Sequence, residues 1–153
     1  MSTIDDRLAE LGLVIPAAAQ PAGSYIPAVI SGNLVFTSGQ LPMVNGALAA
    51  TGKVGDAVSA ADAAGYAATC ALNALAAVKT AIGSLDRVTR IVKVVGFVAS
   101  HPQFTAQPSV INGASDLLKE IFGDVGIHAR SAVGVAVLPL DSPVEVELIV
   151  EFA

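Results

Sequence analysis

An arginine and two glutamates stand inside the two apolar strands near the end of this sequence. The stretch HARSAVGVAVLPLDSPVEVELIVEF, residues 128 to 152, places Arg130 at the head of the first strand and Glu145 and Glu147 in the second. Single charges on a strand are usually solvated. An arginine that points at a contact surface instead needs a counter-anion or a carboxylate ligand, which its guanidinium holds through two parallel hydrogen bonds. Arg130 is therefore a candidate for binding a small carboxylate.

Side chains alternate between the two faces of a strand, and this alternation assigns the charges to a face. In the second strand the expected core set is Val144, Val146, Leu148 and Val150, which leaves the opposite face to Glu145, Glu147, Ile149 and Glu151. In the first strand we expect Val133, Val135 and Val137 to lie under helices. The face shared with the glutamates then carries Arg130, Ala132, Gly134 and Ala136.

The proline-bounded turn between these strands predicts a hairpin. Matching the two valine faces pairs Leu138 with Glu145 and Ala136 with Glu147, because a slip of one residue would bury the glutamates. Arg130 then lies about 20 to 25 Å from Glu145 within one chain. The two side chains cannot share a site in a monomer, so a common site requires Arg130 from one chain and Glu145 from the next.

The composition favours one domain that associates with copies of itself. The 153 residues fit a single domain over residues 1–153, in which residues 1–24 form an N-terminal helix and linker. The hydrophobic share of 54% exceeds what a core of this size needs. We therefore expect apolar surface between subunits arranged with closed symmetry.

Charge and cysteine content exclude several classes of protein. Eight basic and 13 acidic residues give a net charge of -5, and no basic cluster is present to follow a phosphate backbone, so we expect no nucleic-acid partner. The apolar runs are too interrupted for a membrane span, and the start of the chain does not resemble a signal peptide. Cys70 is the only cysteine, which suits a reducing cytoplasm, and we expect it to be buried.

The periodicity predicts an α+β sandwich with the order β-β-α-β-α-β-β and two helices on one face of the sheet. A short N-terminal helix precedes it at Thr3 to Leu13. The expected elements are a hairpin at Ile26–Ser31 and Leu34–Ser38, a helix at Ser59–Ile82, a strand at Arg90–Ser100 covered on both faces, a helix at Pro108–Phe122, and the last two strands. Gly32-Asn33 is the expected hairpin turn.

Three segments resemble the YjgF/RidA-type imine deaminases. They are GSYIPAV…GNLVFTSGQLP (23–42), VINGASDLL (110–118) and ARSAVGVAVLP…VEVELI (129–149). The segments RLAELGLVIP, FVASHPQFTAQPSVINGASDLL and HARSAVG are similar to a divergent branch labelled endoribonuclease L-PSP-like. The resemblance implies a chorismate-mutase-like fold with a mixed sheet, a homotrimer with sites between subunits, hydrolysis of small 2-imino acids to 2-keto acids and ammonia, and no metal or cofactor.

The resemblance also implies roles for individual residues. Arg130 matches the arginine that clamps the substrate carboxylate, and Glu145 matches the carboxylate that positions or deprotonates the attacking water, for which partial desolvation is needed. The implied substrate-binding residues are Tyr25 at the mouth of the cleft, Ser38 with its hydroxyl, Gly39 with its backbone N–H, and Asn112 on the second helix. Many members carry a cysteine two residues after the arginine, where this chain has Ala132.

Structural interpretations stand beside these roles. Tyr25 can simply begin a strand, Ser38 and Gly39 can form a turn, and Asn112 can tie a helix to a loop. His101 is expected in a loop, and His128, two residues before Arg130, is expected to be structural or to point the same way as the arginine. A non-catalytic module that binds small carboxylates is the alternative function. A ribonuclease is disfavoured because the chain has an acidic balance and no visible pair of histidines for acid–base cleavage.

Overall fold

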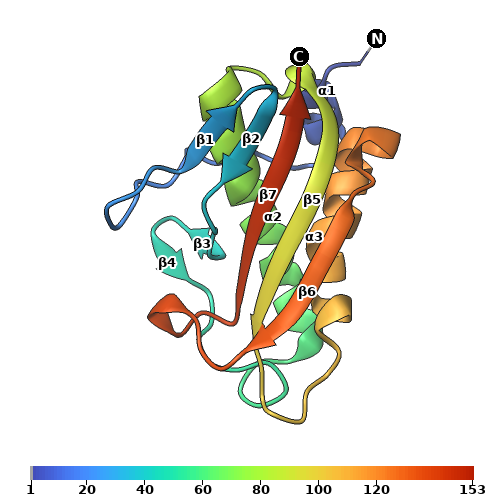
Figure 1. Ribbon diagram of the computed structural model, residues 1–153. Helices are drawn as coiled ribbons and strands as arrows, with labels where there is room; N and C mark the ends of the chain where they lie inside the picture. Colours follow the sequence, from blue (N-terminus) through green and yellow to red (C-terminus); the bar gives the residue numbers. More distant parts are fainter. Residues whose placement is uncertain (1) are drawn as a thin grey trace.

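A five-stranded sheet backed by two long helices forms the molecule, seen in a computed structural model that describes residues 2–153 (Figure 1). The strands lie in the order β1-β2-β7-β5-β6. Their bounds are β1 Ala28–Ser31, β2 Leu34–Thr37, β5 Val88–Ala99, β6 Ala129–Val135 and β7 Val144–Phe152. Helices α2 (Ala60–Ile82) and α3 (Gln107–Phe122) lie side by side on one face. This arrangement confirms the predicted α+β fold; the face without helices is called the open face below.

The smaller elements refine the prediction. Helix α1 is shorter than expected, at Ile4–Glu10, and begins with a capping box in which Thr3 and Asp6 bond each other's backbone. A second small hairpin, β3 (Met43–Val44) and β4 (Ala47–Leu48), was not predicted. Its turn is Asn45-Gly46 with positive φ at both residues, a strong hairpin signal that the sequence does contain. Single 3₁₀ turns complete the chain at Leu85–Arg87 (η1), Gly123–Gly126 (η2) and Pro139–Asp141 (η3).

Strands β6 and β7 do not form the predicted hairpin, because β5 lies between them. Strand β6 pairs with β5 in parallel and β7 pairs with β5 antiparallel. Helix α3 connects β5 to β6, and a strand–helix–strand crossover places its two strands in parallel. The connection after β6 then crosses the end of β5, where Ser100 N–H bonds the Val135 carbonyl and Ala99 N–H bonds the Pro143 carbonyl. The predicted pairs of Leu138 with Glu145 and of Ala136 with Glu147 are wrong.

The face assignment is confirmed for β7 and wrong for β6. Val144, Val146, Leu148 and Val150 are buried against the helices. In β6, Arg130 pairs with Val94, whose buried side chain faces the helices, so Arg130 points toward the helix layer. Val133 and Val137 are instead 44% and 66% exposed. The reversal follows from the parallel pairing with β5, which the hairpin assumption did not include. Strand β5 is likewise covered by helices on one face only.

The core lies between the sheet and the two helices. Alanines of α2 are buried in it together with Cys70, as expected, and burial raises the pKa of the Cys70 thiol well above its ordinary value. The two helices approach closely at Gly113 of α3, where an added Cβ would meet the backbone carbonyl of Ala64. None of the helices within residues 2–153 combines the length and the apolar character needed to cross a bilayer.

We predict opposite stability effects for two helical glycines. Gly113→Ala should lower the free energy of unfolding by about 1–3 kcal/mol, because the methyl group forces α2 and α3 apart. Gly65→Ala is the matched control on α2: nothing lies within 4 Å of its added Cβ, so a gain of about 0.5–1 kcal/mol is expected. Urea unfolding measures both. A Gly113→Ala protein as stable as the parent would contradict the close packing of the helices.

Candidate functional site

Arg130 reaches from the edge strand β6 to helix α3. Its Nη1 donates to Asn112 Oδ1 at 2.7 Å and to Ser115 Oγ at 3.2 Å. Asn112 and Ser115 are three residues apart, so they lie on one face of the helix. The N–H groups of Nε and Nη2 have no acceptor among residues 2–153, and the ion pairs found there join other residues. Arg130 therefore keeps its charge and one two-donor edge available for an anion.

His128 belongs to the same cluster. Its Nε2 lies 2.8 Å from Ser115 Oγ, and its Nδ1 lies 2.6 Å from the Gly126 carbonyl oxygen. The expectation that His128 points the same way as Arg130 is met, since both side chains contact Ser115. Sequence reasoning did not find Ser115. The signal that identifies it is its spacing of three residues from Asn112 on a helix.

Glu145 lies on the open face and folds over Gly39. A Cβ built on Gly39 would overlap the Glu145 carboxylate and would lie 2.8 Å from its Cδ, so a larger residue at this position would push the carboxylate aside. Gln40 holds this segment by exchanging backbone hydrogen bonds with Val146 at 2.8 and 3.0 Å. Partial burial raises the pKa of Glu145 from its ordinary value of 4.5, and the neighbouring carboxylate of Glu147 raises it further.

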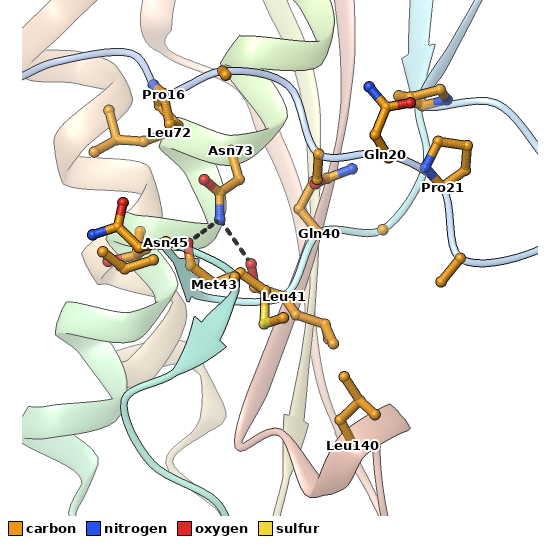
Figure 2. Close-up of a pocket in the computed structure, with 18 of the residues that line it drawn as sticks. Pro16, Gln20, Pro21, Gln40, Leu41, Met43, Asn45, Leu72, Asn73 and Leu140 are labelled. Atoms are coloured by element: carbon orange, nitrogen blue, oxygen red, sulfur yellow. Dashed lines mark hydrogen bonds between the residues drawn. The ribbon is translucent and has the colours of Figure 1, made fainter.

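A cavity of about 660 Å³ opens beside this segment (Figure 2). Its wall comes from the linker before β1, the chain after β2 and helix α2, and it includes Tyr25 and Gly39. Asn73 of α2 fixes the wall by donating to the carbonyls of Leu41 and Met43 at 2.9 and 3.0 Å. Ser38 does not line the cavity; its hydroxyl donates to the Ile26 carbonyl at 2.6 Å.

The chain thus holds two groups of predicted site residues that do not meet. One consists of Tyr25, Ser38, Gly39 and Glu145, and the other of Asn112 and Arg130. Arg130 pairs with Val94 of β5, and Glu145 pairs with Phe97 of the same strand. Positions three apart on a strand face opposite sides.

The expected distance between Arg130 and Glu145 was too large, because it rested on the hairpin. The observed register separates them by about 10 Å along β5 and about 10 Å across it. The conclusion that one chain does not bring them together still holds, for a different reason: the sheet lies between them.

Other ligand chemistry has less support in this part of the molecule. Within residues 2–153, no three His, Cys, Asp or Glu side chains gather as metal ligands would. Ala132 packs against the core from the same strand face as Arg130, where many members of the resembled family carry a thiol. The other polar groups near Arg130 are the amide of Asn112, the hydroxyl of Ser115 and the imidazole of His128, and none of them is a carboxylate that would repel an anion.

Several solved structures resemble the chain, and two of them are informative here. A protein of unknown function from Agrobacterium tumefaciens, Atu1372, is 50% identical with a TM-score of 0.91, and the match covers 98% of this chain and 92% of that one. The structure of Escherichia coli TdcF with bound serine is 28% identical with a TM-score of 0.64, over 89% and 94% of the two chains. The likeness to TdcF shows that a small ligand binds a protein of this fold.

Sequence comparisons agree with the structural ones. Protein TCP17 of Trypanosoma cruzi is 46% identical over 95% of this chain and 91% of its own. A 2-iminobutanoate/2-iminopropanoate deaminase of Dermatophagoides farinae is 36% identical over 88% of this chain and 91% of its own. The family model described as "YjgF/chorismate mutase-like, putative endoribonuclease" matches residues 5–152. Because the family model covers nearly the whole chain and both relatives are more than 30% identical over most of it, the chain belongs to the YjgF/chorismate mutase-like family.

Proposed function

We propose that this protein hydrolyses small 2-imino acids to 2-keto acids and ammonia. The observation that carries the proposal is the state of Arg130: neutral partners hold its Nη1, and the Nε–Nη2 edge is open. That edge matches a carboxylate in geometry and charge. The relative from Dermatophagoides farinae is named for the same reaction and is similar over most of its length.

Glu145 is the proposed group that acts on water. A carboxylate of ordinary pKa is a weak base at neutral pH, and partial burial raises the pKa of Glu145 toward the range in which it accepts a proton effectively. In the proposed reaction, water adds to the C=N carbon while its proton passes to Glu145. Glu145 returns this proton to the nitrogen, which gives a carbinolamine. Glu145 then takes the hydroxyl proton and passes it to the nitrogen as the C–N bond breaks and the C=O bond forms, so that ammonia leaves a 2-keto acid.

The proposed site lies between two copies of the chain, because the sheet separates Arg130 from Glu145 within one copy. The open face offers a surface for such contact. Its apolar side chains Val29, Phe36 and Val133 are 50%, 40% and 44% exposed. Exposed apolar groups gathered on one face favour association between subunits. We propose a homotrimer with three equivalent sites, each with Arg130 from one chain and Glu145 from the next.

A carboxylate-binding module without catalysis is the second candidate. The bound serine in TdcF favours it, since serine carries a carboxylate but no imine. Calorimetric titration with 2-ketobutyrate, run beside the kinetic assay, separates the two candidates. Binding without turnover favours the module, and turnover favours the enzyme.

Cleavage of RNA has little support despite the wording of the family description. Acid–base cleavage of a phosphodiester needs proton-transfer groups on both sides of the phosphate. Both ring nitrogens of His128 already have protein partners, and His101 Nδ1 accepts the N–H of Gln103. The net charge of -5 also disfavours binding of a polyanion.

Arg130→Ala should lower kcat/KM for imine hydrolysis about 100-fold, since a charged hydrogen-bonded pair with the substrate is lost. Threonine dehydratase or an amino-acid oxidase generates the imine in situ, and keto-acid release above the spontaneous rate is measured. Lys119→Ala removes an exposed cation from the same helix layer and should leave the rate unchanged. Wild-type protein that does not accelerate keto-acid release would refute the enzyme proposal.

Glu145→Gln should stabilise the protein at pH 7 but hardly at pH 4. Below about 4.5 the carboxyl group is protonated in both the folded and the unfolded chain. As the pH rises through the raised folded pKa, the unfolded chain ionises first, so the stability of the wild type falls. Thermal unfolding at the two pH values measures the difference. Glu120→Gln, at an exposed position of α3, is the control. An equal gain at both values would show that charge is not its cause.

Light scattering should give a mass near three chains. The exposed apolar residues of the open face favour association, and the number three is what the family resemblance implies. Phe36→Glu places a charge on this face and should shift the mass toward one chain together with loss of activity. Ile30→Glu, at an exposed position of β1 on the other face of the sheet, should change neither. A monomeric wild type at assay concentration would exclude a site shared between copies.

A further inference from the structure

A chain of hydrogen bonds runs from the Gly126 carbonyl through His128 and Ser115 to Arg130. The carbonyl oxygen of Gly126 only accepts, so His128 Nδ1, 2.6 Å away, carries a hydrogen. In the neutral ring, Nε2 is then an acceptor, and the Ser115 hydroxyl donates to it across 2.8 Å. A lone pair of Ser115 Oγ remains for Arg130 Nη1 at 3.2 Å. Every link has one donor and one acceptor.

The chain determines the orientation of the guanidinium. One hydrogen of Nη1 goes to Ser115 and the other goes to Asn112 Oδ1 at 2.7 Å. The guanidinium is planar and rigid. Fixing both hydrogens of Nη1 therefore also fixes the directions of the other three N–H hydrogens, on Nε and Nη2. The Nε–Nη2 edge is thereby held away from α3 before any ligand arrives.

We propose that His128 and Ser115 are positioning residues for Arg130, which aim its free edge at the substrate carboxylate. The inference rests on the proposed function for the identity of that ligand. It goes beyond that function in one respect. The tautomer of His128 and the hydroxyl of Ser115 set the affinity of Arg130 for the carboxylate, although neither residue touches the substrate. If the hydrogen of the ring were on Nε2 instead, Ser115 Oγ would face two donors, His128 Nε2 and Arg130 Nη1. The hydroxyl hydrogen of Ser115 would then have no acceptor among the side chains and carbonyls that bond it within residues 2–153.

The same pair could instead be a nucleophile and its base. Ser115, His128 and the Gly126 carbonyl are joined by successive hydrogen bonds, as in sites where a histidine activates a serine. One observation disfavours this role: Arg130 donates to the same Oγ, which lowers the nucleophilicity of the oxygen and occupies a lone pair needed for attack. A fluorophosphonate probe should therefore leave Ser115 unmodified, and labelling of Ser115 would overturn the positioning role.

The tautomer can be measured without substrate. Nitrogen-15 spectra of the imidazole rings should show His128 as a neutral ring with hydrogen on Nδ1 at pH 8, and His101→Gln assigns the signals because these are the only histidines. Ser115→Ala should shift the Nε2 resonance of His128 and speed hydrogen exchange at Arg130 Nη1. A ring with hydrogen on Nε2 would overturn the proposal, whatever the protein does to imines.

Kinetics and binding then test the consequence. Ser115→Ala should raise KM for the imine and Kd for 2-ketobutyrate about tenfold with kcat within twofold, as expected for one lost hydrogen bond to a charged group. Ser115→Thr should restore both, because it keeps the hydroxyl. Thr80→Ala removes a comparable helix hydroxyl bonded to the Ala76 carbonyl and should change neither.

The outcomes distinguish the two proposals. A loss in kcat alone for Ser115→Ala, or no change in KM and Kd, would refute positioning. If the wild type neither turns over imines nor binds 2-ketobutyrate, the proposed function fails, while the tautomer and the exchange rates at Arg130 still decide whether His128 and Ser115 hold the guanidinium.

Discussion

The pairing of β5 on both of its edges is the constraint on which the site depends. Strand β7 binds one edge antiparallel and β6 binds the other in parallel. Because side chains alternate along β5, the residues paired with Val94 face the helices and those paired with Phe97 face outward. Burial of the valines of β7 fixes this register, since a slip of one residue would bury three glutamates. The opposite directions of Arg130 and Glu145 follow from it.

The position of β6 at the edge of the sheet explains the polar cluster around Arg130. An edge strand is covered by helices only in part, and above β6 the nearest surface is the face of α3 that bears Asn112 and Ser115. A guanidinium can reach these groups while its stem stays over the sheet. Val133 points to the other face of the sheet, which no helix within residues 2–153 covers, and is therefore exposed. One strand therefore presents a charge to the helix layer and apolar surface to the open face.

Local sequence patterns predicted the helices and strands well. They failed to predict strand pairing and side-chain direction where these depend on residues distant in the sequence. Ser59 and Gly83 bound α2 as its capping signals indicate, and the alternation of β7 predicted its buried set. The short connection after β6 suggested a hairpin, but the crossover through α3 had already placed β6 on the far edge of β5. The contact of Gly39 with Glu145 joins segments about one hundred residues apart, and no local pattern reports such a contact.

Both proposed site groups carry local costs that folding alone does not explain. A half-buried Glu145 beside Glu147 weakens the folded state at neutral pH, and the missing Cβ at Gly39 makes room for that carboxylate rather than for core packing. Arg130 is held through one nitrogen, while its three other N–H groups have no acceptor in the described part of the chain, residues 2–153. Places where a sequence departs from what stability favours are where binding or catalysis is expected. In this protein the two departures lie on opposite sides of one sheet, which is why the proposed site takes one group from each of two copies of the chain.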